Sequence, residues 1–162
     1  MAKDYFLKID KIKGESTDSK HKGEIEIESF SWGESNPHDQ SSRAGGHGAG
    51  KVSFQDLHFT KLVDSASPLL MHFCATGEHI GEALLSVRKQ GGDQQDYYKV
   101  KLTDGLVSSY QSGGSGAGNS VPMDQFSINF AKIQYEYYPQ DKSGKLGSPN
   151  KGGWDLSSNK KL

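Results

Sequence analysis

One glycine-rich stretch has nearly the composition of a phosphate-binding loop. Gly45, Gly50 and Lys51 follow the spacing at which such a loop wraps backbone N–H groups and a lysine around phosphates. The next position should be a serine or threonine that binds Mg²⁺, but Val52 has no hydroxyl. A phosphate-binding loop also joins a buried strand to a helix, whereas this loop precedes an alternating strand. We therefore predict no bound nucleotide and no other cofactor.

Histidines and serines are numerous, but their spacing does not predict a catalytic or metal site. None of the six histidines forms a close pair at metal-ligand spacing, and His72 and His79 bracket the expected end of a helix. No serine lies in a nucleophile-elbow pattern. Glu24, Glu26 and Glu28 alternate with apolar residues and fit the solvent face of a strand. The sequence therefore predicts neither an enzyme nor a metal site.

Composition and charge narrow the class of protein. The chain has 162 residues and a net charge of −1, which suits one domain over residues 1–162 with no electrostatic affinity for nucleic acid. Charged residues are spread through the first ten positions, which contain no secretory apolar region. No apolar run approaches the roughly 20 residues of a transmembrane helix. We expect synthesis in the cytoplasm, no membrane insertion, and any export to proceed without a cleaved signal peptide.

Residues 65–77 are the only segment with a helical pattern. Ser67 is expected to cap the first turn through its hydroxyl, and Pro68 suits the first helical position. Gly77 can adopt the left-handed conformation that ends a helix. A helix of about ten residues is marginal alone in water, so it must pack on the rest of the protein. The face predicted to do so carries Leu69, Leu70, Phe73 and Cys74, the last as a small buried apolar residue without a disulfide partner.

Strand patterns precede and follow this helix. They fall near residues 4–12, 24–32, 51–62, 83–88, 98–102, 106–110 and 124–138. Within three of these strands the apolar residues switch from odd to even positions, which indicates β-bulges or strands that pass from one packed layer to another. We therefore predict a mainly-β fold, a small closed barrel or tight sandwich, with one short helix packed on its side.

Two segments lack a clear pattern. Residues 33–50 contain no apolar residue except two alanines, and so long a loop in a small domain is usually functional or disordered. Residues 140–162 read as a polar, turn-rich tail that Trp154 anchors to the body.

The order of short motifs along the chain resembles the Hcp family, the tube-forming proteins of bacterial type VI secretion systems. Each motif is weak alone, and the resemblance depends on their collinear order over nearly the whole chain. The motifs are Ile12-Lys13-Gly14-Glu15-Ser16, Ser31-Trp32-Gly33, Gly48-Ala49-Gly50-Lys51-Val52, Phe59-Thr60-Lys61, Ser67-Pro68, Leu106-Val107-Ser108-Ser109, Asn129-Phe130-Ala131, Tyr138-Pro139-Gln140 and Gly153-Trp154.

This resemblance implies a β-barrel with a helix on its side and an assembly made of many copies. Six copies would close into a ring, and rings would stack into a hollow tube. A contractile sheath would drive the tube, with a spike protein at its tip, out to the medium or into a target cell. Small effector proteins would travel inside the lumen.

The resemblance also suggests which residues serve assembly and cargo. Residues 33–50 match the family's extended loop, which reaches the adjacent ring. Phe30 and Trp32 are expected to face the core, which turns Ser29 and Ser31 to the opposite side. That side is either the lumen, where effectors would bind, or the outer wall. The candidate stacking residues are Asn36, Pro37, His38, Asp39, Arg43 and Gly46.

A second function stays open on the sequence alone. A carbohydrate-binding β-sandwich could use exposed tyrosines to stack on sugar rings. Such a lectin would remain monomeric or form small oligomers and would bind glycans. The tyrosines in question are Tyr98, Tyr110, Tyr135, Tyr137 and Tyr138.

Overall fold

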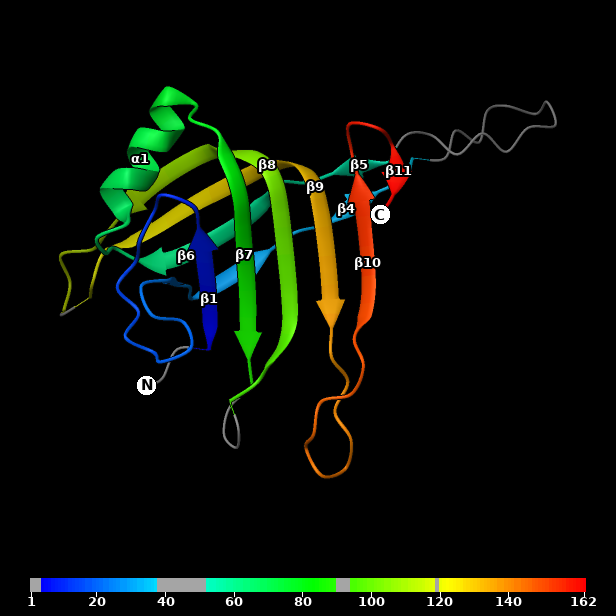
Figure 1. Ribbon diagram of the computed structural model, residues 1–162. Helices are drawn as coiled ribbons and strands as arrows, with labels where there is room; N and C mark the ends of the chain where they lie inside the picture. Colours follow the sequence, from blue (N-terminus) through cyan, green and yellow to red (C-terminus); the bar gives the residue numbers. More distant parts are fainter. Residues whose placement is uncertain (1–3, 38–51, 90–93, 119) are drawn as a thin grey trace.

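Antiparallel strands make up most of the protein in the computed structural model, which describes residues 4–37, 52–89, 94–118 and 120–162 (Figure 1). Within these ranges a single helix, α1, interrupts the series of strands. The elements are β1 (Tyr5–Ile9), β2 (Ile25–Glu26), β3 (Ser29–Ser31), β4 (Glu34–Ser35), β5 (Ser53–Phe54), β6 (Leu57–Leu62), α1 (Ser67–Thr76), β7 (Ile80–Arg88), β8 (Asp96–Gly113), β9 (Met123–Tyr137), β10 (Asn150–Asp155) and β11 (Lys160–Lys161).

Two long strands connect the parts of the main sheet. The sheet runs in the order β11-β10-β9-β8-β7-β1-β2, and β6 pairs with both β3 and β9. The first half of β9 pairs with β6 at Met123–Ile128, whereas its second half pairs with β10 at Lys132–Tyr137. The apolar parity of β9 switches between these halves. The switch therefore marks where the strand leaves one packed layer and enters another, as the sequence predicted.

The predicted strand at 24–32 also divides between two layers. β2 pairs with β1, and β3 pairs with β6. Between them the Ile27 N–H donates to the Tyr5 carbonyl at 3.0 Å, and the Glu28 N–H donates to the Thr60 carbonyl at 2.8 Å. The segment thus connects the part of the sheet that contains β1 to the part that contains β6. The sheet itself is not closed, because β2 and β3 form separate short ladders.

The sequence predicted separate strands at 98–102 and 106–110, but β8 is continuous through both. Asp104 lies between them with a positive φ of 54°, which is why the alternating pattern breaks there. At the next position only glycine fits, since a Cβ on Gly105 would lie 2.1 Å from the Asn129 carbonyl oxygen of β9. The strands therefore cross closely at this point without ending.

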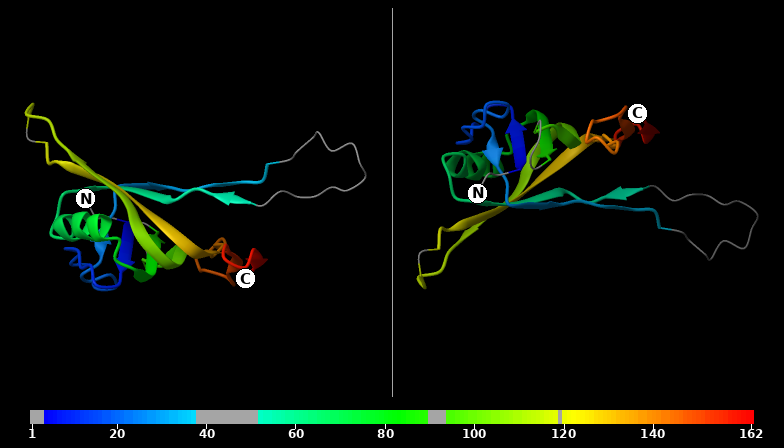
Figure 2. Two further views of the ribbon diagram at one scale, coloured as in Figure 1. Left: turned by 90° about the horizontal axis from the view of Figure 1, so that it is seen from above. Right: turned by 90° about the horizontal axis from the view of Figure 1, so that it is seen from below.

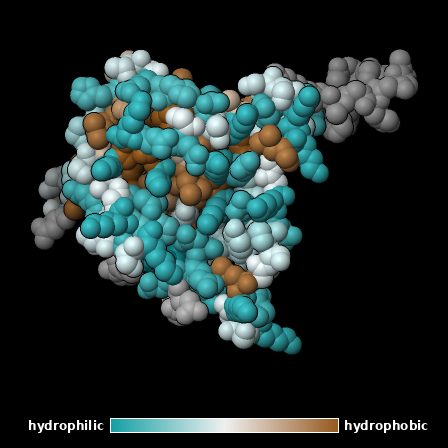
Figure 3. Space-filling model, viewed as in Figure 1, coloured by the Kyte–Doolittle hydropathy of each residue, from teal (hydrophilic) through white to brown (hydrophobic). Residues whose placement is uncertain are grey.

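The core fills the space between the layers of strands and beneath the helix. Phe59 and Phe126, paired across β6 and β9, stack with ring centroids 5.0 Å apart. Apolar side chains gather beside the helix in the face drawn in Figure 3, and most of the remaining face is polar. The buried core includes Leu7, Ile9, Ile25, Ile27, Leu57, Leu70, Phe73, Leu85, Val100, Leu102, Val107, Ile128, Phe130 and Ile133.

The helix begins and ends where the sequence predicted, but two of its residues behave differently. Gly77 is left-handed at φ 68°, and its N–H donates to the Phe73 carbonyl. The predicted cap at Ser67 is wrong, because Ala66 holds the capping position and makes no side-chain hydrogen bond there. The predicted burial of Leu69 is also wrong, since that side chain is 39% exposed. Of the four predicted apolar residues, Leu70 and Phe73 are buried, and Cys74 is half-buried.

Residues 140–162 are more regular than the sequence predicted. β10 extends the sheet beside β9, and β11 pairs with β10. Trp154 is half-buried and packs on the core, as expected. Lysine, asparagine and two glycines in β10 give little intrinsic preference for a strand. Pairing with the long β9 ladder therefore decides the conformation of this segment.

Candidate functional site

Side chains form three parallel rows across the paired strands β3, β6, β9 and β8. The middle row is aromatic and faces inward: Phe30, Phe59, Phe126 and Tyr110. The rows on either side hold only hydroxyl, amide and imidazole groups, and all of their side chains except the buried Ser127 are exposed or half-buried. One is Ser31, His58, Ser127 and Ser109, and the other is Ser29, Thr60, Gln125 and Gln111.

We call these two flanking rows the neutral polar face. Ser29 and Ser31 are exposed on it, whereas Phe30 and Trp32 are half-buried against the core, so the predicted alternation is confirmed. The Ser29 hydroxyl forms a hydrogen bond with the Thr60 hydroxyl of β6. The two rows contain no Asp, Glu, Lys or Arg, and they offer many hydrogen-bond donors and acceptors.

The first strand of a short hairpin stem lies within the predicted loop 33–50, and the second strand follows that loop. Glu34 pairs with Phe54, and Ser35 pairs with Ser53, so β4 and β5 form their own two-stranded sheet. This stem projects from the side opposite the β8–β9 hairpin (Figure 2). Asn36 and Pro37 are exposed just beyond it. The other predicted stacking residues, His38, Asp39, Arg43 and Gly46, lie outside the described residues, and so does the glycine-rich stretch 45–51.

A buried ionic network fixes the start of the helix to the strands. The Lys61 ammonium is fully buried and donates to Asp124 Oδ2 at 2.9 Å, to Asp64 Oδ1 at 2.7 Å and to Ser67 Oγ at 2.8 Å. Ser67 in turn donates to Asp124, and the Tyr110 hydroxyl donates to Asp124 Oδ1 at 2.9 Å. Ser67 therefore acts as a link between α1, β6 and β9 and not as a helix cap.

The electrostatics of this network favour an ionised Asp124. Burial alone raises the pKa of a carboxyl group, but hydrogen bonds from Ser67, Lys61 and Tyr110 outweigh it and leave the pKa of Asp124 below its ordinary value. Burial also raises the pKa of the Tyr110 phenol, which thus stays protonated as a donor. The sequence contained a signal for this pair, because Lys61 continues the inward parity of Leu57 and Phe59.

A second network holds the long connection between β1 and β2 against the body. His21 is buried, stacks on Phe6 with centroids 4.4 Å apart, and contacts Glu24 Oε2 at 2.7 Å and Asp96 Oδ1 at 3.0 Å. Beside it Arg88 donates to Asp18, and this bond holds the pKa of that carboxyl group below its usual range. The network thus joins residues far apart in the sequence.

The described residues contain no group of three or more His, Cys, Asp or Glu side chains placed to hold a metal ion. Within the same ranges, no helix is long and apolar enough to cross a membrane. In the His21 and Lys61 networks, the His21 ring nitrogens and the Lys61 ammonium bond to side chains of the protein itself. These bonds connect elements of the fold.

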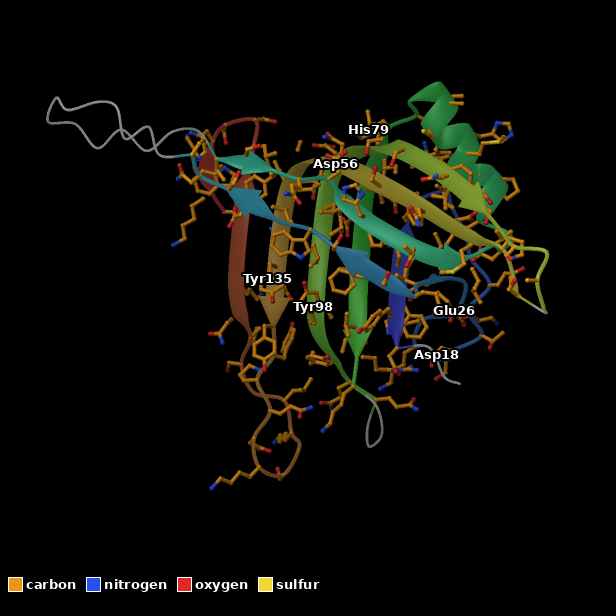
Figure 4. The ribbon with its side chains drawn as sticks, turned by 180° about the vertical axis from the view of Figure 1, so that it is seen from behind. Asp18, Glu26, Asp56, His79, Tyr98 and Tyr135 are labelled. Atoms are coloured by element: carbon orange, nitrogen blue, oxygen red, sulfur yellow. The ribbon has the colours of Figure 1, made fainter. Side chains whose placement is uncertain are left out.

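Four of the five tyrosines that suggested sugar binding are half-buried. Tyr98 and Tyr135, labelled in Figure 4, stand on the side of β8 and β9 that β3 crosses, and their rings lie 5.0 Å apart. The Trp32 indole N–H donates to the Tyr98 hydroxyl at 3.0 Å. Tyr110 is tied to Asp124, and Tyr138 donates to Glu136 at 3.0 Å. Tyr137 is exposed, and the other four tyrosines are partly covered by these contacts.

Comparisons with known proteins agree with the fold. The family model "Type VI secretion system effector, Hcp" matches residues 6–137. The protein hcp1 of Pseudomonas aeruginosa is 44% identical over 161 residues, which are 98% of this chain and 98% of the relative. A solved structure of a type six secretion system protein aligns with a TM-score of 0.92 and 36% identity, covering 99% of this chain and 100% of the other.

Hcp1 of Salmonella typhimurium is similar as well, with a TM-score of 0.82, 38% identity and full coverage of both chains. Fold, motif order and whole-chain identity thus agree, and the family is one of secreted structural components and not a known enzyme family. The chain belongs to the Hcp family, the tube proteins of type VI secretion systems.

Proposed function

We propose that six copies of this protein, each a single domain, close into a ring. The rings stack into the inner tube of a type VI secretion machine, and the lumen of the tube carries small effector proteins. The spike at the tip and the contractile sheath would be its other partners. The single observation that carries this proposal is the neutral polar face on a protein of the Hcp family. A conduit for varied proteins needs a wall that offers hydrogen bonds but holds no passenger through strong charge.

The edges of the strands that bear this face support ring closure. In the described part of the chain, β3 pairs only with β6, and β8 beyond Gly105 pairs only with β9. Each edge therefore leaves backbone N–H and C=O groups for another strand. Because the two edges differ, joining one to the other in the next copy is a head-to-tail contact, which forms a ring when the rotation closes.

The ring itself is tested with the purified protein. Light scattering should give the mass of six chains, and negative-stain images should show rings with a central hole. A monomer at every concentration that can be reached would contradict the proposal. A monomer that binds a glycan array would instead favour the lectin alternative.

Replacing Ser31 with arginine should empty the lumen without breaking the ring. Ser31 is exposed on the neutral polar face, so six bulky charges would project from that face while the core stays intact. We expect rings of normal mass that lose the small proteins that co-purify with the parent, as measured by mass spectrometry. The matched control is Ser19→Arg, at an exposed serine in the connection between β1 and β2. Unchanged recovery of those proteins would place Ser31 on the outer wall.

Deleting residues 36–46 should stop tube assembly but not ring closure. The segment begins directly after β4 of the hairpin stem, and its two described residues, Asn36 and Pro37, are exposed. Surface loops are usually shortened without loss of the core. Light scattering should still give rings, while tubes disappear from negative-stain images and the protein disappears from the culture medium. Monomers in place of rings would assign the loop to the contact within a ring.

A further inference from the structure

An exposed apolar patch lies where β6 ends and β9 begins, at the base of the β8–β9 hairpin. Leu62 and Met123 are paired across the two strands, and Val63 and Val121 adjoin them. The Val63 N–H donates to the Pro122 carbonyl at 3.0 Å, which keeps the two segments together. These four side chains are between 37% and 52% exposed. We call them the end patch, and apolar groups gathered in this way mark a contact surface.

The end patch stands on a rigid base. Lys61 precedes Leu62 and Asp124 follows Met123, so the buried ion pair lies directly beneath the patch. The same network holds the first turn of α1 through Ser67. The backbone that carries the apolar side chains is therefore held in place, which lowers the entropy cost of binding at the patch.

An aromatic cleft of about 210 Å³ lies on the other side of the molecule. Its walls include Trp32, Phe54, Tyr135 and Trp154, and Glu34 stands beside them. Gly152 adds no side chain, which leaves room along β10. The lining is mostly apolar, so the cleft suits a flexible aliphatic or thioether group and not a charged one.

The patch and the cleft cannot meet in one copy of the chain. The strand β9 carries Met123 at its start and Tyr135 near its end, about 12 residues later, which is roughly 40 Å along an extended strand. Figure 2 shows the β8–β9 hairpin and the strands β4, β5 and β10 on opposite sides of the body. A contact between patch and cleft must therefore join two copies head to tail.

Both surfaces also adjoin the two free strand edges. Met123 pairs with Gly113 at the end of the part of β8 that pairs only with β9, and Trp32 follows directly after β3. We propose that the end patch of each copy docks into the aromatic cleft of the next, with the Met123 side chain inserted between the rings. This inference rests on the proposed ring and adds to it the residues that lock each junction.

A charge at Met123 should therefore abolish the ring while leaving the fold intact. We expect Met123→Glu to remain monomeric by light scattering at concentrations where the parent protein forms rings. Its melting curve should match that of the separated parent subunit, because the side chain is exposed. The matched control is Met71→Glu, on the outer face of α1 and exposed to a similar extent, which should still form rings. Normal rings from Met123→Glu would overturn the inference.

Disulfide trapping tests the same junction without removing it. A cysteine at Gly152 fits, because a Cβ there would have no atom within 4 Å. In a Cys74→Ser background, oxidised rings of Met123→Cys/Gly152→Cys should give a ladder of covalent multimers up to six chains on a denaturing gel. Each single cysteine, and the control pair Met123→Cys/Lys11→Cys, should give no ladder.

The outcomes separate this inference from the proposed function. Intact rings without the ladder, or a Gly152→Cys thiol in intact rings that reacts freely with a maleimide, would show an open cleft and overturn the docking alone. A parent protein that is monomeric throughout would overturn the ring and the docking together.

Discussion

Replacing Lys61 with alanine is expected to lower the free energy of unfolding by about 3–5 kcal/mol. The ammonium group is fully buried and is held by Asp124, Asp64 and Ser67 at distances of 2.7 to 2.9 Å. Its removal leaves the buried Asp124 carboxylate without its cation, and little solvent can replace it. The measurement is urea unfolding followed by circular dichroism. Protein concentration must be kept equal between variants, because ring formation also stabilises the folded state.

Two controls separate a buried ion pair from the loss of any lysine. Lys101→Ala removes an exposed ammonium 3.6 Å from Glu82, and it should cost less than about 1 kcal/mol. The double variant Lys61→Met/Asp124→Leu removes both buried charges and should recover much of the loss, because no uncompensated charge remains. A Lys61→Ala variant as stable as the parent would show that water reaches Asp124 and that the network is not dry.

Replacing Phe73 with alanine is expected to cost about 3–5 kcal/mol as well. Phe73 is 6% exposed and contributes its ring to the core beneath α1. The helix has only ten residues, and Leu70 and Phe73 are the two apolar side chains that it buries completely, so a cavity at Phe73 removes much of its attachment. The loss should appear as a lower urea midpoint with an unchanged slope.

The matched control lies on the same helix. Leu69→Ala removes an apolar side chain that is largely exposed, and it should change the free energy of unfolding by only about 0.5 kcal/mol. Equal effects at Leu69 and Phe73 would mean that the helix is rotated and that its outer face is covered in the assembled ring.

The sequence by itself determined the features that depend on local pattern and backbone geometry. Gly77 predicted the end of the helix because a left-handed residue without a Cβ costs nothing there. Alternation predicted that Ser29 and Ser31 face away from Phe30 and Trp32, because successive side chains of a strand point to opposite sides. The parity switches predicted strands that change layers, and the collinear motifs predicted the family.

Only the tertiary structure decided the features that depend on partners distant in the sequence. Ser67 has the sequence context of a helix cap, but its hydroxyl instead accepts from Lys61 and donates to Asp124. Leu69 lies on the apolar half of an isolated helix, but the body covers a narrower stripe. β10 has the composition of a tail and becomes a strand because β9 offers it a complete ladder. In each case the observed conformation depends on which groups from distant segments are buried together. A local sequence pattern does not contain that information.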